Sequence, residues 1–413
     1  MNDSRQSSFK QTITFYYLYN VFSNLVFHRG IFILFLGYKG LSGFEIGLLQ
    51  ATLFWSNLVT EVPAGVFGDR FGRRSSILAG LACMTFVGLG FLLFDHFYAF
   101  LCLFVLEGLG MSLISGSDIS LLYDEVNAEK GKATFLSVMG KSYGISLYAI
   151  GIATLIGGFL QKISWNVVYA SYSLSMMVAF LCIFMIHENR DYFEKAKADE
   201  SADKSFNRQV ISFFRTDRGR HVLMLMFVVA TFDSAFLGYY MFGQRLFEYY
   251  HLDITHIALL YMISRFISAT TFMASPKILE KLAPITAIYL CMFITSSLLF
   301  VNFFITSAPA AVAVFLLMIA FPYLLAAVMS NHIHQCIPSE IRASVVSVSN
   351  MVRSLVLSSF YLIIGYLVDL LLPNQALALL GFFPLGCMLF LAINRDIQAK
   401  IVKDYLQEPA SSV

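Results

Sequence analysis

Long apolar runs, separated by short polar stretches, recur along the whole chain. Each run holds roughly 20 residues or more, the length that an α-helix needs to cross the hydrocarbon core of a bilayer. The pattern therefore predicts twelve transmembrane helices. They cover about 13–37, 43–64, 75–94, 97–122, 133–160, 165–186, 221–247, 254–275, 284–305, 309–331, 341–370 and 374–394.

One polar stretch, 187–220, is dense in charges of both signs and has six predicted helices on either side. The fold class predicted is therefore an all-α membrane protein of two six-helix bundles. The first bundle would cover 1–186, and 187–220 would be a cytoplasmic linker. The second would cover 221–413 and end in a short cytoplasmic tail. Each bundle is expected to be a structural repeat, as in two-bundle transporters.

Composition supports a lipid environment. Hydrophobic residues make up 58% of the 413 residues and charged residues only 13%, whereas soluble domains carry about 25% charged residues. The formal net charge of +2 gives no reason to expect a nucleic-acid partner. The six cysteines fall mostly inside apolar runs without a C-x-x-C pair. We expect them to be reduced, and we expect no metal site.

The distribution of Lys and Arg predicts the orientation of the chain. With the N-terminus inside, most of the 28 basic residues fall in inner segments, whereas the predicted outer loops hold Lys39 and Lys162. Cytoplasmic loops are the ones enriched in Lys and Arg. We therefore expect a multi-pass protein of the plasma membrane (the inner membrane in a bacterium), with both termini cytoplasmic.

A loop rich in glycine and arginine lies between the second and third predicted helices. It reads Gly65-Val66-Phe67-Gly68-Asp69-Arg70-Phe71-Gly72-Arg73-Arg74. This run resembles the G-x-x-x-D-R-x-G-R-R/K signature of the major facilitator superfamily, and the resemblance extends to the topology of the whole chain. Glycine at Gly65 and Gly72 suits close backbone approach and a sharp turn.

The resemblance implies a cytoplasmic gate that opens in each transport cycle. The Asp69 carboxylate would meet the start of the helix at 341–370, near Ser339 and Glu340, because helix N-termini favour anions. Arg73 would bridge Asp69 to Asp124. The expected gate residues are Gly65, Asp69, Arg70, Gly72, Arg73 and Asp124. Arg74 needs no such role, because it fits a positive-inside topology signal.

Two further family patterns are only partly present. Phe104 stands where many members carry an arginine in the fourth helix. The fifth helix keeps Gly140, Gly157 and Gly158 of the pattern found in antiporters, but Thr154 replaces its proline. Small residues at these positions favour close helix packing.

Ionisable residues inside apolar runs are costly, and they normally face the interior of a helix bundle. The resemblance places their helices along or beside the central path. The six are Arg29, Glu107, Lys141, Asp233, Arg265 and Arg353. Four cations against two acids favour an anionic or zwitterionic substrate over a purely cationic one.

Asp233 and Glu107 are the candidate proton-coupling carboxylates. Asp233 lies near the middle of the seventh predicted helix, where Arg265 or Arg353 could pair with it in one conformation only. An alternative for Glu107 is a structural pair with Lys141. The basic residues Arg29, Lys141, Arg265 and Arg353, together with Tyr239, are expected to line the substrate cavity. Asp118 is expected to be a structural charge that faces a loop.

These features favour a transporter that is not an enzyme. No phosphate-binding glycine loop or other ATP-site motif occurs, so a proton gradient is the expected driving force and no cofactor is expected. His332 and His334 alone offer too few ligands for a metal. The first hypothesis is a monomeric proton-coupled exporter (antiporter) of a small amphiphilic molecule, such as a drug, siderophore or metabolite. An uptake symporter and a non-transporting membrane sensor are the alternatives.

Overall fold

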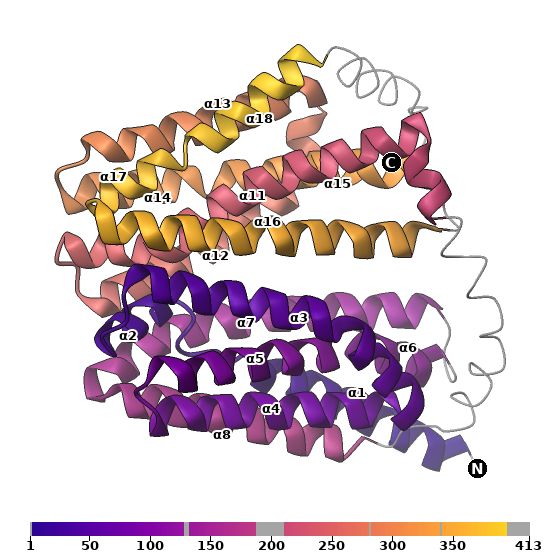
Figure 1. The fold of residues 1–413 in the computed structure, drawn as a ribbon. Coiled ribbons are helices and arrows are strands. Elements are labelled where there is room, and N and C mark those ends of the chain that lie inside the picture. Colours follow the sequence, from indigo (N-terminus) through magenta and orange to yellow (C-terminus); the bar gives the residue numbers. More distant parts are fainter. Residues whose placement is uncertain (1, 128–131, 187–209, 281, 339–340, 395–413) are drawn as a thin grey trace. The chain divides into compact units, whose positions relative to one another are not determined.

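The computed structural model of the chain describes residues 2–127, 132–186, 210–280, 282–338 and 341–394. All regular elements in these ranges are helices (Figure 1). In the first half these are α1 (Asn2–Ser23), α2 (Phe32–Tyr38), α3 (Gly43–Phe71), α4 (Arg73–Leu93), α5 (Phe97–Ile114), α6 (Ser117–Asn127), α7 (Lys132–Ile163) and α8 (Trp165–Phe184).

The second half contains a similar series of helices. It comprises α11 (Asp217–Tyr249), α12 (Ile254–Leu279), α13 (Pro284–Val301), η2 (Asn302–Phe304), α14 (Ala308–Met318), α15 (Ala320–Cys336), α16 (Arg342–Leu370), α17 (Pro373–Leu379) and α18 (Phe382–Ile393). The predicted linker ran to residue 220, but α11 already begins at Asp217. The 187–209 part of that linker lies outside the described residues.

The structure has helix at each of the twelve predicted spans. Among the described residues, ten helices or pairs of consecutive helices are long and apolar enough to cross a membrane. The first two predicted spans are not among these ten. The run at 13–37 is divided between α1 and α2, and α3 carries acidic residues at Glu45, Glu61 and Asp69.

Contacts divide the chain into two compact units. Unit 1 comprises Met1–Leu41, Thr52–Ser201 and Asp253–Met262, and unit 2 comprises Ser42–Ala51, Ala202–Leu252 and Ile263–Val413. These units differ from the two predicted bundles at two places. The start of α3 packs within unit 2, and the start of α12 packs within unit 1.

The interior of unit 1 is an aromatic cluster. The rings of Phe35 and Tyr169 have centroids 4.3 Å apart, and Phe91 lies 5.0 Å from Tyr169 and 5.8 Å from Phe35. All three side chains are buried. Tilted and edge-on aromatic pairs add to the energy of apolar burial, so this cluster joins α2, α4 and α8 into one body.

The interior of unit 2 is a largely aliphatic cluster. It draws buried side chains from α11, α13, α15, α16 and α18, among them Leu225, Ile288, Met329, Val345 and Leu391. Three buried cysteines, Cys291, Cys336 and Cys387, belong to the same cluster and are not in disulfides.

The start of α3 is held on α16 by glycine contacts within unit 2. A Cβ on Gly47 would lie 2.2 Å from the carbonyl oxygen of Tyr361, and one on Gly365 would lie 2.3 Å from that of Gly43. The Asp369 carboxylate accepts hydrogen bonds from the backbone N–H of Gly43 (2.6 Å) and of Phe44 (2.8 Å). These N–H groups have no partner within their own helix, so a carboxylate here stabilises its start.

Candidate functional site

The first predicted helix is interrupted at residues 24–31. α1 ends at Ser23, and a series of tight turns follows, with hydrogen bonds such as Arg29 N–H to Val26 O at 3.2 Å. The break fits against α7 because Gly157 has no side chain: a Cβ there would lie 1.7 Å from the carbonyl oxygen of Phe27. Irregular backbone at membrane depth is tolerated where protein or a cavity surrounds it. The break therefore sets the position of Arg29.

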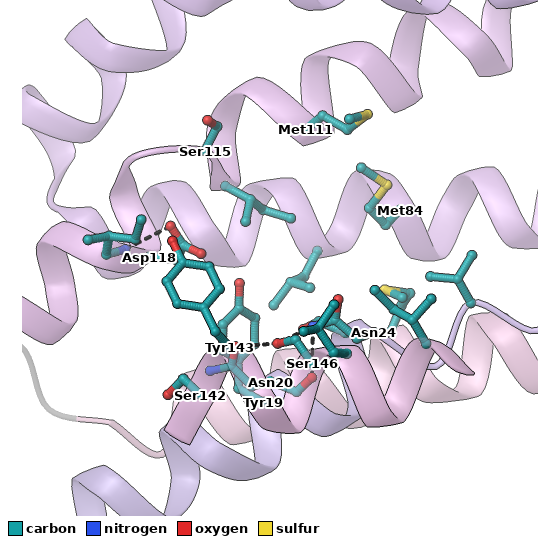
Figure 2. A pocket seen from close by; sticks show the side chains of 18 of the residues that line it. Tyr19, Asn20, Asn24, Met84, Met111, Ser115, Asp118, Ser142, Tyr143 and Ser146 are labelled. Atoms are coloured by element: carbon teal, nitrogen blue, oxygen red, sulfur yellow. Dashed lines mark hydrogen bonds between the residues drawn. The ribbon is translucent and has the colours of Figure 1, made fainter. Parts of the chain in front are cut away.

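A cavity of about 550 Å³ lies within unit 1 (Figure 2). Its walls come from α1, the break, α4, α5, α6, α7 and α8. Met84 and Met111 supply flexible apolar surface, while Asn20, Asn24 and Ser146 supply polar groups. A mainly apolar cavity with a few placed polar groups is the usual form of a small-molecule site.

The polar groups of this cavity form a connected network. Asn24 Nδ2 donates to Asn20 O at 2.8 Å and to Ser146 Oγ at 3.1 Å, and Ser146 Oγ donates to Asn20 Oδ1 at 3.2 Å. Further along α1, Tyr16 Oη donates to the backbone oxygen of Asp118 at 3.4 Å. The network joins α1, α6 and α7 and orients amide and hydroxyl groups around the cavity.

Three charged residues line the same cavity: Arg29, Glu107 and Asp118. The first two lie close enough for their charges to act on each other. Oε2 of Glu107 is buried and has no hydrogen-bond partner among the described residues. Asp118 Oδ1 accepts a hydrogen bond from the backbone N–H of Ile119 at 2.7 Å. The cavity thus contains charges of both signs.

Tight packing of α5 against α3 fixes the position of Glu107 along the helix axis. The next residue, Gly108, faces α3, where an added Cβ would lie 2.6 Å from Ser56 Cβ and 2.7 Å from the carbonyl oxygen of Leu53. The hydroxyl of Ser56 also donates to Val105 O at 2.7 Å. Buried contacts of this kind restrict α5 to one register against α3.

Sequence reasoning missed several residues of this cavity. Asp118 lines the cavity, whereas we expected it to face a loop. Asn20, Asn24 and Ser146 were not singled out. The spacing of Asn20 and Asn24, four residues apart in an apolar run, is a usable signal, because residues i and i+4 share one helix face.

Lys141 takes a different position from the one expected. Its side chain is exposed, and among the described residues it does not line the cavity that contains Glu107. The predicted structural pair of Glu107 with Lys141 is therefore not formed at that cavity.

In unit 2, Asp233 and Arg353 form an ion pair. Nε and Nη2 of Arg353 both lie 2.8 Å from Asp233 Oδ2. The Asp233 side chain is 22% exposed and that of Arg353 49% exposed. Arg265, the other cation considered for this role, lies over the ring of Tyr240 at 5.2 Å from its centroid. The structure thus brings Asp233 together with one of the two expected cations.

Tyr239 belongs to the packed interior of unit 2, contrary to the expectation that it lines an open path. Its side chain is 0% exposed. The hydroxyl donates to Asn302 Oδ1 at 3.3 Å, and the ring lies 6.1 Å from that of Phe315. A buried tyrosine hydroxyl normally has such a partner, so a structural role explains this residue.

The loop with the family signature has the predicted turn but a different close contact. Gly72 has φ of 99°, a backbone conformation that favours glycine. Around Gly65 an added Cβ would meet nothing within 4 Å, whereas at Gly68 it would lie 3.2 Å from Ser117 Oγ. Close approach thus occurs at Gly68 and not, as expected, at Gly65.

Asp69 and Arg73 of that loop form an ion pair, with Arg73 Nη2 2.6 Å from Asp69 Oδ1. The onward link from Arg73 to Asp124 stays a prediction. Ser339 and Glu340, the expected partners at the start of α16, lie outside the described residues. Arg70 lies over the ring of Phe71, 5.5 Å from its centroid.

Comparison with known proteins gives a consistent family assignment. The sequence model of the Major Facilitator Superfamily matches residues 20–360. Multidrug resistance protein 2 of Bacillus subtilis (strain 168) is 26% identical over 273 residues, which cover 63% of this chain and 64% of that protein. The chain spans less than two thirds of the length of the curated relatives it matches, from 31% to 64%.

Solved structures share the fold at low sequence identity. The nucleoside transporter NupG superposes with a TM-score of 0.75 at 11% identity, covering 95% of this chain and 98% of that one. A D-xylose–proton symporter superposes with a TM-score of 0.69 at 12% identity, covering 92% and 96%. The all-helical fold predicted from the sequence is thus confirmed, and these similar proteins are described as transporters and not as enzymes.

Proposed function

Because this chain belongs to the Major Facilitator Superfamily, whose model matches residues 20–360, we propose that it is a secondary transporter that works by alternating access. More specifically, we propose a proton-coupled exporter of a small amphiphilic molecule that carries an anionic or zwitterionic group. The observation that carries the proposal is the cavity of unit 1, where Glu107 and Arg29 face one space.

The lining of the cavity supports an amphiphilic substrate. Met84 and Met111 offer adaptable apolar surface, because methionine fills irregular gaps and tolerates varied partners. Arg29 offers a fork of donors that suits a carboxylate or phosphate. Glu107 and Asp118 offer the opposite charge. Within the proposed class, a zwitterion satisfies both signs better than a simple anion does.

Glu107 is the proton site in this proposal. A buried carboxylate oxygen without a hydrogen-bond partner is costly when it is charged. Binding a proton removes that cost, and releasing it leaves a charge that Arg29 or a bound substrate can neutralise. Substrate and proton would then compete for one cavity, which is the property that exchange of one for the other requires. Asp233 lies outside this cavity, and its Oδ2 is 2.8 Å from Arg353 Nη2.

The similarity to Multidrug resistance protein 2 favours export over uptake in this proposal. The matched region covers 64% of that protein. The test is flux in proteoliposomes with an imposed pH gradient, screened over zwitterionic, anionic and cationic compounds. Proton influx that drives movement of a zwitterion in the opposite direction supports the proposal. Movement of proton and solute in the same direction would establish an uptake symporter, and no flux for any compound would favour a non-transporting sensor.

Orientation in the membrane is part of the proposal. Both termini and the 187–220 linker are placed in the cytoplasm of a plasma-membrane protein that functions as a monomer, with the lipid bilayer as its surroundings. A cysteine tag near position 200 should be protected from a membrane-impermeant label in intact cells, and one near Ser307 should react. Labelling at position 200 from outside would reverse every statement about sidedness.

The cytoplasmic gate is proposed to depend on the charge of Asp69. Asp69→Asn keeps the shape of the side chain but loses the ion pair with Arg73. We expect transport to fall sharply while the protein still folds and inserts. The control is Asp217→Asn, which breaks an exposed pair with Arg220 (3.0 Å) and should leave transport unchanged. Normal transport by Asp69→Asn would contradict the gate assignment.

A further inference from the structure

Two histidines and a cysteine meet in the interior of unit 2, outside the cavity described above. His221 lies in the first turns of α11, and His332 and Cys336 lie in the last turns of α15. His332 and Cys336 are four residues apart and so share one face of α15. All three side chains are buried, with 4%, 6% and 1% of their surface exposed.

The donor atoms of these residues converge on a small space. Nε2 of His221 lies 3.4 Å from Nε2 of His332, and Sγ of Cys336 lies 3.8 Å from the same His332 atom. All three donor atoms lie within 4.8 Å of one another. A single His332 Nε2 can use only one of its two neighbours at a time as a hydrogen-bond partner. A cation between the three atoms would use all of them together.

Two of the three separations between the donor atoms agree with tetrahedral metal coordination. Zn–N bonds of about 2.05 Å and Zn–S bonds of about 2.3 Å place two nitrogen ligands about 3.3 Å apart and a nitrogen and a sulfur about 3.6 Å apart. The observed separations are 3.4 Å and 3.8 Å. By contrast, N–H···N contacts shorter than about 3.2 Å would be expected for a well-formed hydrogen bond between the two rings.

We propose that His221, His332 and Cys336 form a binding site for Zn²⁺. Two imidazoles and a thiolate suit zinc and disfavour Mg²⁺ and Ca²⁺, which prefer oxygen ligands. Three protein ligands leave the fourth tetrahedral position to water. This inference replaces our expectation that His332 has too few partners for a metal, and it does not depend on the proposed transport function.

The surroundings of the site favour tight binding. Val222, Leu225, Met329 and Ile337 belong to the same buried cluster as Cys336. In such an apolar setting a thiolate is costly by itself, and a cation that neutralises it is strongly favoured. The metal would join the start of α11 to the end of α15, two helices whose apolar side chains pack together in this cluster. We therefore expect zinc to stabilise unit 2.

The test uses the full-length protein purified in detergent and stripped of metal with a chelator. Zinc added back should bind at about one ion per chain, measured by mass spectrometry of the metal, and should raise the thermal midpoint. Co²⁺ in place of zinc should give two spectral signatures. One is a thiolate-to-metal absorption band in the near ultraviolet, and the other is the set of visible absorption bands typical of four-coordinate cobalt. Ca²⁺ and Mg²⁺ should do neither.

Matched variants assign the site. Cys336→Ser and His332→Gln preserve size and should weaken zinc binding by more than about 10-fold, because even the loss of an outer partner of a metal ligand costs about 10- to 100-fold. Cys291→Ser is the control, since Cys291 is 1% exposed in the same cluster and should bind zinc like the wild type. Size-exclusion profiles of the stripped proteins show that each variant is folded.

Two results would overturn the proposal. One is a stripped wild-type protein that takes up no zinc and gives no thiolate band with cobalt, which would leave a simple His–His contact. The other is zinc binding that survives unchanged in both Cys336→Ser and His332→Gln, which would assign the metal to other residues.

Discussion

Glu107 in unit 1 and Asp233 in unit 2 are both carboxylates inside apolar helices, but their surroundings differ. Asp233 forms an ion pair with Arg353, whose Nε and Nη2 atoms both lie 2.8 Å from Asp233 Oδ2. Glu107 has a buried oxygen without a hydrogen-bond partner among the described residues, and it faces a cavity of about 550 Å³. A carboxylate that accepts hydrogen bonds from a cation is stable as a charge, whereas a buried carboxylate oxygen without a hydrogen-bond partner is stabilised by a proton or by a ligand. We propose from this comparison that Glu107, rather than Asp233, is the coupling group.

The unit 1 side of this comparison depends on Gly157, which admits the helix break that carries Arg29. In Gly157→Ala the new Cβ would lie 1.7 Å from the carbonyl oxygen of Phe27. Both clashing atoms are fixed to the main chain, so we expect a loss larger than the roughly 1–3 kcal/mol of ordinary overpacking. Thermal unfolding in detergent should show a large fall in midpoint, and transport should be lost.

The control for this prediction is Gly144→Ala. Gly144 lies on the same helix, α7, and a Cβ there meets nothing within 4 Å. The thermal unfolding midpoint of Gly144→Ala should equal that of the wild type or lie slightly above it, because alanine stabilises a helix more than glycine by about 0.5–1 kcal/mol. Equal midpoints for the two alanine variants would show that the break is not held by this contact.

On the unit 2 side, Arg353→Ala should destabilise the protein by leaving the charge of Asp233 without this cation. The pair is partly exposed, because the Arg353 side chain is 49% exposed and the Asp233 side chain 22% exposed. Its loss should therefore cost about 1–3 kcal/mol, between the values for surface and for buried ion pairs. The double variant Arg353→Ala/Asp233→Asn should recover most of this, measured by thermal unfolding. A double variant no more stable than Arg353→Ala would mean that Asp233 is not ionised in the native state.

Much of this architecture follows from local sequence patterns. The apolar runs predict helix at all twelve positions, and the turn at Gly72 follows from the loop signature. The break at residues 24–31 could not be predicted in this way. It contains the polar residues Asn24, His28 and Arg29, but isolated polar residues do not by themselves end a helix, and the contact that admits the break, at Gly157, lies far away in sequence. The Asp369 carboxylate at the start of α3 is a second long-range contact of this kind.

In the candidate site, too, some residues can be predicted from the sequence and others depend on long-range packing. Glu107 and Arg29 stand out in the sequence because ionisable residues are rare in apolar helices. Asn20, Asn24 and Ser146 are only polar, so their convergence becomes visible once α1 and α7 are packed. In the same way, His221 lies on a different helix from His332 and Cys336, so spacing along the chain could not bring the three together.

A smaller effect is expected at Asp253, a carboxylate outside the membrane-spanning segments. It accepts a hydrogen bond from the backbone N–H of Thr255 (2.8 Å) at the start of α12 and lies 3.7 Å from Lys162 Nζ. The side chain and the backbone N–H of Thr255, both beside the carboxylate, hold the pKa of Asp253 below its ordinary value. Because the folded-state pKa is lowered, the stabilisation is present above the ordinary pKa of about 3.9 and is lost as the pH falls through the folded-state pKa.

Asp253→Asn should therefore lower the midpoint by the equivalent of about 1 kcal/mol or less at neutral pH. The difference from the wild type should shrink as the pH is lowered below about 4. Thermal unfolding at a series of pH values measures both. A difference that grows on acidification would contradict the predicted sign. Asp253 belongs to unit 1 but does not line its cavity, and we expect the variant to leave transport intact.

The central claim is that Glu107 carries the coupled proton while Asp233 remains a paired charge. Glu107→Gln and Asp233→Asn each replace an ionisable carboxyl group with an amide of the same shape, so they can be compared in the same proteoliposomes. The measurement uses the compound that the proteoliposome screen identifies as a substrate. Its movement under an imposed pH gradient is compared with its exchange across the membrane without a gradient. We predict that Glu107→Gln keeps exchange but loses the movement driven by the gradient, whereas Asp233→Asn keeps both. Gradient-driven movement that persists in Glu107→Gln and is lost in Asp233→Asn would contradict the claim and assign the proton to Asp233.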